Sequence, residues 1–235
     1  MKRGRRYPVW AGLLGAAMLL GPAPVVATPA KPLVVVELFQ SQGCSDCPPA
    51  QINLNRLADR PDLLALSFGV TYWDYLGWKD SFASPQFTQR QRDYSARNHD
   101  VGVATPQYWI NGRQTVFGAS AARVAQLVSQ PAPTGPAVEI SGGVLRIAGG
   151  AAPRGGAEIL LVRYDPRTTR VAIRVGENGG RTIPHRNIVR ELRSIGHWSG
   201  LAKSLSMPPA TISGLHTAIL LQAGRGGPIL AAVKV

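Results

Sequence analysis

The sequence predicts an α/β domain in residues 28–130, followed by a small all-β, sandwich-like domain in residues 137–235. In the first part, near-continuous apolar runs of strand length alternate with helical segments, which is typical of strands buried on both faces. In the second part, helical periodicity is nearly absent, and turn residues separate short alternating strands, as in antiparallel sandwiches. A stretch rich in proline and glycine, residues 131–136, is the predicted linker.

The first 27 residues are predicted to be a signal peptide. Residues 1–6 carry four basic side chains, residues 9–21 are apolar but too short to span a bilayer comfortably, and Ala27 offers a small residue for cleavage. An uncleaved anchor is the alternative. We therefore expect a periplasmic or secreted protein with no stable membrane span after cleavage, in a compartment where disulfides persist.

The first predicted elements surround the only two cysteines of the chain. Residues 33–39 predict a buried strand, and Pro48 suits the first turn of a helix that runs to about Asp59. Residues 63–70 predict the next buried strand. Strand, Cys-x-x-Cys, helix and strand in this order form a right-handed crossover unit. The sequence thus brings the cysteine pair to the start of a helix.

The rest of the first domain is predicted to include a hairpin. Asn111-Gly112 is a strong signal for a two-residue hairpin turn. The elements around it are a loop with five aromatic side chains at residues 71–82, a polar helix at 85–98, strands at 108–110 and 114–117, and an amphipathic helix at 119–129.

The second domain is predicted to consist of seven short strands. They lie at residues 138–140, 144–147, 159–162, 171–175, 188–195, 215–222 and 229–235. A group of polar residues between 177 and 187 is interpreted as a turn and a solvated strand face, with a contact to the first domain or to an anionic partner as the alternative.

The net charge of +13 is uneven along the chain. Residues 135–235 carry thirteen basic and five acidic side chains, whereas residues 28–134 carry nine and eight. Basic surfaces attract polyanions, but arginines on solvated strand faces explain the pattern, and no nucleic-acid partner is expected for an exported protein. The sequence contains no phosphate-binding glycine loop, serine hydrolase elbow or zinc-protease motif.

Cys44 and Cys47 predict thiol–disulfide chemistry. The amides at a helix N-terminus stabilise a thiolate, so Cys44 is expected to be the exposed attacking thiol and Cys47 the more buried resolving thiol. Asp46 opposes the anion, which predicts a less depressed Cys44 pKa and a more reducing couple than in strong oxidants.

Two other interpretations of the pair remain open. The loop between the cysteines is too short for an effective structural staple. Two thiolates supply only half of a closed zinc shell, and a copper site would need a third ligand. No metal and no cofactor are therefore expected, and a copper-handling protein or a non-enzymatic envelope binding module is the alternative.

Strand, Cys44-x-x-Cys47, helix, strand and then Thr105-Pro106 before a hairpin resemble the thioredoxin fold. In that family a cis-proline stands beside the cysteine pair, which implies that Pro106 is cis and that Thr105 presents its backbone to a substrate strand. An ordinary trans turn proline is the alternative. The resemblance also implies a buried carboxylate that relays a proton from Cys47, which would be Glu37. A carboxylate at a strand edge or paired with an arginine is the alternative.

A closer resemblance is to a secreted, thioredoxin-like family of uncharacterised proteins, domain of unknown function 1223. It rests on residues 36–49 and 72–80, and residues 176–178 and 185–190 also match. It covers most of the mature chain and implies a periplasmic thioredoxin-like protein, but no reaction is assigned to the family.

The function that the sequence favours is a periplasmic thiol–disulfide oxidoreductase. Trp73, Tyr75 and Trp78 follow the second strand, and ligands gather at this end of open α/β sheets, so these rings are expected to wall a substrate groove. Packing of the rings against neighbouring elements is the alternative. The expected partners are a thiol- or disulfide-containing protein or peptide and an unidentified electron donor.

Overall fold

The computed structural model describes residues 1, 4 and 31–235, so the predicted signal peptide lies almost wholly outside the described residues. The first half contains β1 (Val34–Gln40), α1 (Cys47–Leu57), β2 (Leu63–Gly69), η1 (Asp74–Leu76), α2 (Pro85–Arg97), β3 (Gln107–Ile110), β4 (Gln114–Phe117) and α3 (Ala121–Val128). The second half contains β5 (Val138–Ser141), β6 (Val144–Ile147), β7 (Ala157–Asp165), β8 (Thr169–Ala172), β9 (Thr182–His185), β10 (Ile188–Trp198), β11 (Lys203–Ser206), β12 (His216–Gln222) and β13 (Ile229–Lys234).

One mixed sheet organises the molecule. Its eight strands follow the order β13-β12-β7-β10-β2-β1-β3-β4. β2 runs parallel to both β1 and β10, and the other neighbouring pairs are antiparallel. β11, β6 and β5 form a second sheet, and β8 and β9 form a two-stranded hairpin.

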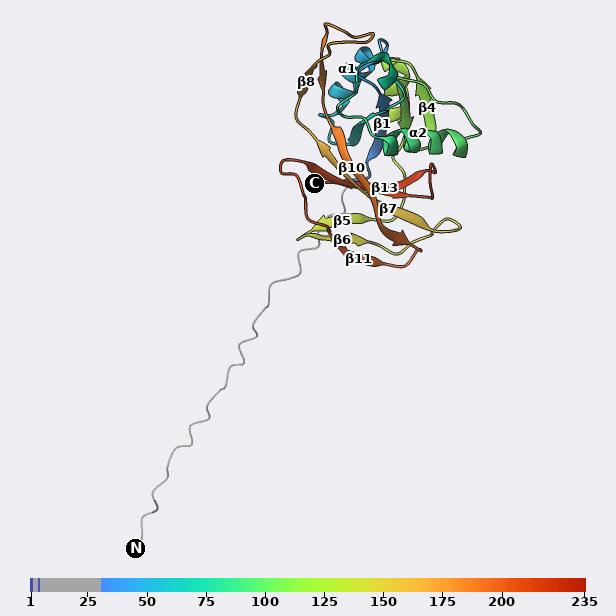
Figure 1. Ribbon diagram of the computed structural model, residues 1–235. Coiled ribbons are helices and arrows are strands. Elements are labelled where there is room, and N and C mark those ends of the chain that lie inside the picture. The colour runs from blue at the N-terminus through green and yellow to red at the C-terminus, as the bar shows by residue number, and fades with distance from the viewer. Residues whose placement is uncertain (2–3, 5–30) are drawn as a thin grey trace.

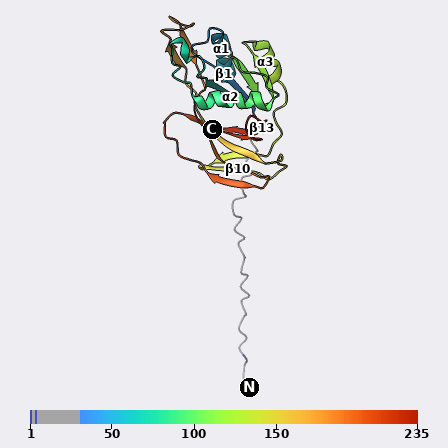
Figure 2. The same cartoon turned by 45° about the vertical axis from the view of Figure 1, so that its right-hand side comes forward.

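Both faces of the large sheet are covered. Successive residues of β1 point to opposite faces of the sheet. Val36 packs with α1 and α3 on one face, and Phe39 packs with α2 on the other. The α2 core continues onto β7, β10 and β12, and the small sheet β11-β6-β5 packs against the other side of β7 and β12. Figure 2 shows α2 crossing between the helical end and the strands of the second half, which lie below it.

The predicted fold class is wrong. The described chain is mostly β, with 37% strand and 17% helix, and it is not an α/β thioredoxin-like domain followed by a separate β-sandwich. Strands from both sides of residues 131–136 join the same sheet, because β10 lies beside β2 and the Ser67 amide donates to the Asn187 carbonyl at 2.9 Å. Hydrophobic periodicity reports which face of a strand is buried, but not which strand lies next to it. Figure 1 shows β10 running from the helical end of the molecule into the second half.

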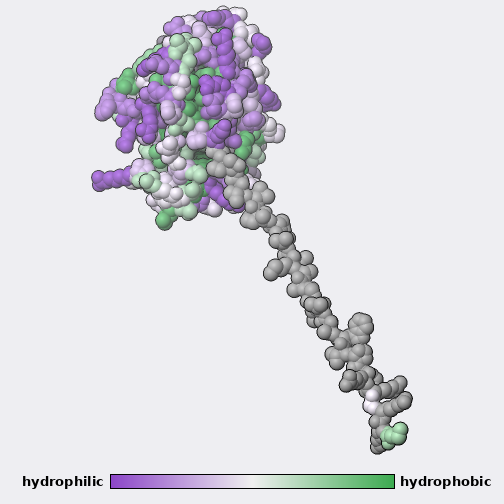
Figure 3. Space-filling view, turned by 180° about the vertical axis from the view of Figure 1, so that it is seen from behind, coloured by the Kyte–Doolittle hydropathy of each residue, from purple (hydrophilic) through white to green (hydrophobic). Residues whose placement is uncertain are grey.

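No helix within residues 31–235 combines the length and the apolar character needed to cross a membrane. Figure 3, which views the molecule from behind, shows hydrophilic side chains over much of the wider part of this face, with hydrophobic ones scattered among them.

Candidate functional site

The cysteine loop, residues 41–46, connects β1 to α1. The Cys44 amide donates to the Ser41 carbonyl at 3.2 Å, and the Cys47 amide donates to the Cys44 carbonyl at 3.2 Å. Cys47 is the first residue of α1, and prolines follow it where a helix leaves its amides unpaired. The sequence therefore folds locally as expected, with the pair at the helix start.

Both thiols are free and buried. Cys44 and Cys47 are each 1% exposed, so Cys44 is not the exposed thiol that the sequence predicts. The Cys44 sulfur donates a hydrogen bond to the Thr105 carbonyl at 3.6 Å. A reagent therefore meets Cys44 only after some neighbouring group moves.

The two thiols have very different acidities. A hydrogen bond from the Cys47 thiol lowers the pKa of Cys44 to about 7, although burial opposes this. Hydrogen bonds from the Thr105 side chain and from the Asp46 and Cys47 amides lower it further. Burial raises the pKa of Cys47 far above the ordinary thiol range, and the hydrogen bond with Cys44 adds to the shift. Cys44 is therefore the sulfur that ionises near neutral pH.

Thr105 and Pro106 lie directly beside Cys44. The peptide bond between them is cis, so the trans alternative does not apply. The Thr105 hydroxyl accepts a hydrogen bond from the Trp73 indole at 2.6 Å. The structure thus brings together Cys44, Cys47, Thr105 and Trp73, although Cys44, Trp73 and Thr105 come from three separate loops.

The aromatic loop covers one side of the cysteine loop. The Trp78 indole donates to the side-chain carbonyl of Gln42 at 2.8 Å. The backbone amide of Gln42 donates to the Asp80 carboxylate at 2.8 Å. Tyr75, in contrast, is 78% exposed and projects into solvent. Trp73 and Trp78 therefore hold the loop itself, and Tyr75 is the ring left free for another molecule.

Sequence reasoning missed Asp80. Its carboxylate is buried, and desolvation raises its pKa to about 6 even though the Gln42 and Phe82 amides donate to it. Its position in a predicted loop was the available signal, because aspartate side chains in turns often accept hydrogen bonds from nearby backbone amides.

Sequence reasoning also assigned the wrong surroundings to the polar group between 177 and 187. The turn that joins β8 to β9, residues 173–181 and here called the hairpin tip, lies on the cysteine loop. Glu177 accepts a hydrogen bond from the Ser45 amide at 2.9 Å. Asn178 is fully buried, and its amide nitrogen donates to the carbonyls of Gln42 at 2.9 Å and Cys44 at 2.7 Å. Glu177 and Asn178 thus bind the cysteine loop and do not belong to a solvated strand face.

Glu37 is not brought to the cysteine pair. Its carboxylate lies on the α2 side of the sheet, where it binds Arg90 at 2.7 Å and accepts a short hydrogen bond from Tyr94. Gln222 of β12 accepts from the same guanidinium at 2.9 Å. The geometry therefore matches the arginine-paired alternative and gives Glu37 no contact with Cys47.

His185 is a second buried titratable group, which the sequence analysis placed with the solvated polar residues between 177 and 187. It is 1% exposed and lies edge-on to Phe82, with ring centroids 5.5 Å apart. Neither ring nitrogen has a hydrogen-bond partner among the described residues. Burial lowers the pKa of His185 to about 4, so the ring is neutral at neutral pH.

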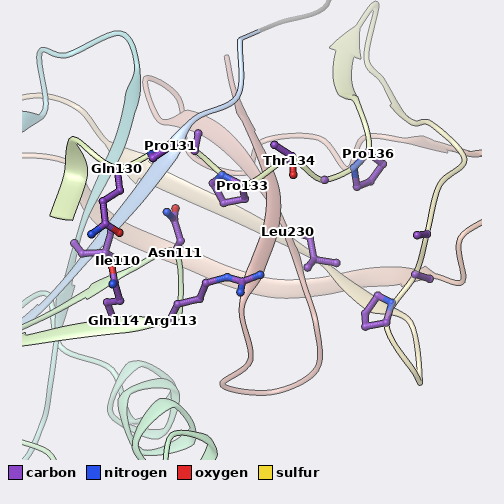
Figure 4. Close-up of a pocket in the computed structure, with 15 residues that line it drawn as sticks. Ile110, Asn111, Arg113, Gln114, Gln130, Pro131, Pro133, Thr134, Pro136 and Leu230 are labelled. Atoms are coloured by element: carbon purple, nitrogen blue, oxygen red, sulfur yellow. The ribbon is translucent and has the colours of Figure 1, made fainter.

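Neither a metal cluster nor a prominent cavity coincides with the cysteines. Residues 31–235 hold no group of three or more His, Cys, Asp and Glu side chains placed for a metal ion. A cavity of about 750 Å³ is lined by the β3–β4 turn, the predicted linker and Leu230 (Figure 4). Asn111 in its wall bonds Val35 near the start of β1, whereas the cysteines follow the end of β1. The cavity thus lies at the opposite end of the strand.

The chain is similar to one known family and to two solved structures. The model of the family described as protein of unknown function (DUF1223) matches residues 35–222. A solved protein of Agrobacterium tumefaciens is 28% identical, with a TM-score of 0.73 over 88% of this chain and 96% of that one. HBP35 of Porphyromonas gingivalis is 12% identical, with a TM-score of 0.54 over 87% of this chain and 75% of that one, which is a likeness of fold alone. No curated protein matches the chain. Because the family model spans both halves of the sheet and the cysteine loop, the chain belongs to the DUF1223 family.

Proposed function

We propose that this protein is a thiol–disulfide oxidoreductase that acts through Cys44 and Cys47. The observation that carries the proposal is the unequal pair at the start of α1. The Cys44 sulfur has a pKa of about 7, and the Cys47 thiol stays protonated and donates a hydrogen bond to the Cys44 sulfur. Such a pair combines a nucleophile that is available near neutral pH with a second thiol close enough to resolve the intermediate.

The reaction proceeds in two exchanges. The Cys44 thiolate attacks one sulfur of a substrate disulfide, a bond forms between these sulfurs, and the other substrate sulfur leaves as a thiolate. Cys47 then gives its proton to that leaving thiolate and attacks Cys44. The Cys44–Cys47 disulfide closes, the second substrate sulfur is released, and two electrons have passed from the protein to the substrate. An external dithiol, the electron donor still to be identified, returns them.

Other groups support the reaction without taking part in it. Thr105 holds Cys44 through its carbonyl, and Trp73 fixes the Thr105 hydroxyl. Glu37 is left out, because its carboxylate is already engaged by Arg90 and Tyr94. We place the reaction outside the cytoplasm, as the predicted signal peptide implies, with a disulfide-containing protein or peptide as the substrate.

The test follows the mass of the reduced protein during reaction with oxidised glutathione. Wild-type protein is expected to lose two hydrogens as the internal disulfide closes. Cys47→Ala is expected to retain one glutathione on Cys44, and Cys44→Ala to react far more slowly because the Cys47 thiol keeps its proton. Reduction of insulin with dithiothreitol as the donor measures turnover. Equal labelling of the two single variants, or the absence of an internal disulfide in wild type, would contradict the proposal.

The reduction potential gives an independent measurement. A Cys44 pKa of about 7 lies far from that of strongly oxidising pairs, whose attacking thiol has a pKa of about 3.5. We therefore expect a potential of about −200 to −300 mV in equilibrium with glutathione or dithiothreitol buffers. A value near about −120 mV would mean that the reduced form is stabilised much more strongly than these contacts explain.

A further inference from the structure

The hairpin tip, which lies in the second half of the chain, binds the cysteine loop. Asn178 lies 134 residues after Cys44 in sequence and binds its carbonyl at 2.7 Å, and Glu177 binds the next amide, that of Ser45. We propose that Asn178 is a positioning residue for Cys44, and that the hairpin tip must lift before a substrate disulfide reaches the Cys44 sulfur. This inference rests on the proposed thiol exchange and adds the step that controls access to it.

The Asn178 side chain is oriented for this contact. Arg181 donates to its Oδ1 atom at 2.8 Å, which leaves both hydrogens of the amide nitrogen for the carbonyls of Gln42 and Cys44. Fixing these two carbonyls fixes the turn that carries Cys44. The same turn aims the amides of Asp46 and Cys47, which help to lower the pKa of Cys44.

The tip also completes the enclosure of the sulfur. Thr105 and the aromatic loop occupy one side of the cysteine loop, and the tip lies across the other. The tip abuts the aromatic loop as well, since a Cβ on Gly176 would lie 3.7 Å from the Leu76 Cβ and 3.8 Å from the Trp78 Cβ. Cys44 is only 1% exposed, so a disulfide reaches its sulfur only after one of these covering segments moves, and we expect the tip to be the segment that moves.

The base of the hairpin is anchored independently of its tip. Asn55 of α1 donates to the Pro184 carbonyl at 3.0 Å, and Arg186 pairs with Asp59 at 2.8 Å. At the tip, Gly176 and Gly180 have φ angles of +81°, a conformation that favours glycine over residues with a Cβ. The tip can therefore leave the cysteine loop by breaking its few hydrogen bonds, while β9 stays packed against α1 and β8 stays paired with β9 (Figure 1).

The experiment measures the rate at which iodoacetamide alkylates Cys44 in reduced protein, across pH, with the site identified by peptide mass. Asn178→Asp keeps the size of the side chain but replaces its donor with a carboxylate oxygen that faces two carbonyls. We expect the plateau rate above the titration midpoint to rise about tenfold, since two hydrogen bonds are lost, and the midpoint itself to move up. Arg181→Met, which only removes the orienting bond, is expected to move both quantities less and in the same direction.

Arg174→Met is the matched control, because Arg174 is an exposed side chain of the same tip with no hydrogen bond to the cysteine loop among the described residues. It should behave as wild type, and thermal melts of each variant show that the fold is retained. A plateau rate for both Asn178→Asp and Arg181→Met within twofold of wild type overturns the access step. A raised plateau with an unchanged midpoint overturns the positioning role. Because alkylation needs no redox partner, a failure of the glutathione test would leave this result intact and would refute the proposed function alone.

Discussion

Two buried polar clusters lie near β1, and they are built differently. Beside the middle of the strand, Glu37 is paired with Arg90 and Tyr94, and Gln222 completes the group. Beyond the end of the strand, the cysteine loop gathers buried groups whose acidities have moved toward or away from neutrality, among them Cys44 and Asp80. The first cluster is a closed set of strong hydrogen bonds, whereas the second holds titratable groups whose pKa values the surroundings shift.

This difference separates a structural role from a chemical one. A buried ion pair with satisfied neighbours ties elements together and stays in one protonation state. Groups held near their titration points can exchange protons at physiological pH, which is what thiol chemistry needs. If the distinction is sound, changes to the Glu37 cluster should alter stability, and changes around the cysteine loop should alter pH dependence and reactivity.

The largest effect is expected from Glu37→Gln. The substitution keeps the shape of the side chain but leaves the Arg90 charge buried without a counter-ion, so stability should fall by about 3–5 kcal/mol in denaturant unfolding. The double variant Glu37→Gln, Arg90→Met should recover part of the loss. A changed pH profile of Cys44 alkylation with little loss of stability would instead place Glu37 in the thiol chemistry.

His185→Leu should change how stability depends on acid. The pKa of His185 is about 4 in the folded protein and about 6.5 when unfolded. The histidine therefore leaves the free energy of unfolding unchanged above pH 6.5 and lowers it progressively as pH falls to 4. The shift corresponds to about 3 kcal/mol, which the leucine variant should retain on acidification. Urea unfolding at several pH values between 4 and 7 measures this directly. Identical pH slopes for the variant and wild type would show that the histidine is not desolvated.

Asp80→Asn should act with the opposite sign. The pKa of Asp80 rises to about 6 on folding. The contribution of Asp80 to the free energy of unfolding is therefore complete below about pH 3.8 and is lost as pH rises through 6. Its shift also corresponds to about 3 kcal/mol, and in wild type it offsets much of the His185 effect. The asparagine variant should therefore lose stability more steeply than wild type as pH falls from 6 to 4. A shallower loss would mean that the carboxylate is ionised throughout this range.

A smaller effect is expected from Trp73→Phe. The change removes the hydrogen bond to the Thr105 hydroxyl and should cost about 1 kcal/mol in thermal or denaturant unfolding. Thr105→Val removes the same bond from the other side and serves as the matched variant. Strictly additive losses in the double variant would mean that the two side chains do not interact in solution.

The smallest change in stability is expected from Tyr75→Ala, because the ring is 78% exposed. Stability should stay within about 0.5 kcal/mol of wild type. If the ring contacts the substrate, the KM for insulin reduction should rise several-fold while the Cys44 alkylation rate stays constant. An unchanged KM would remove Tyr75 from the substrate groove.

Local features of the site could be predicted from the sequence because they depend on neighbours in the chain. The apolar run before Cys44, the prolines after Cys47 and the turn at Asn111-Gly112 each encode a conformation over a few residues. The cis bond before Pro106 followed from a family resemblance rather than from such a rule.

The long-range features could not be predicted in this way. An asparagine in a glycine-rich turn has the same pattern whether it faces water or, like Asn178, binds two buried carbonyls. Likewise, the apolar residues at the start of β10 suit either a sandwich or the edge of β2. These choices depend on which free hydrogen-bonding edges the rest of the fold leaves open.

The position of β10 has a consequence for how this chain can be divided. Ser67 of β2 donates to the Asn187 backbone, and the Asn187 side chain donates to the Ala65 carbonyl at 2.7 Å. A fragment that stops near residue 130 would therefore expose an unpaired strand edge in what is now the middle of the sheet, near the loop and helix that carry the two thiols. We therefore expect that neither residues 31–130 nor residues 137–235 fold separately, because each would lack the strands that complete the shared sheet.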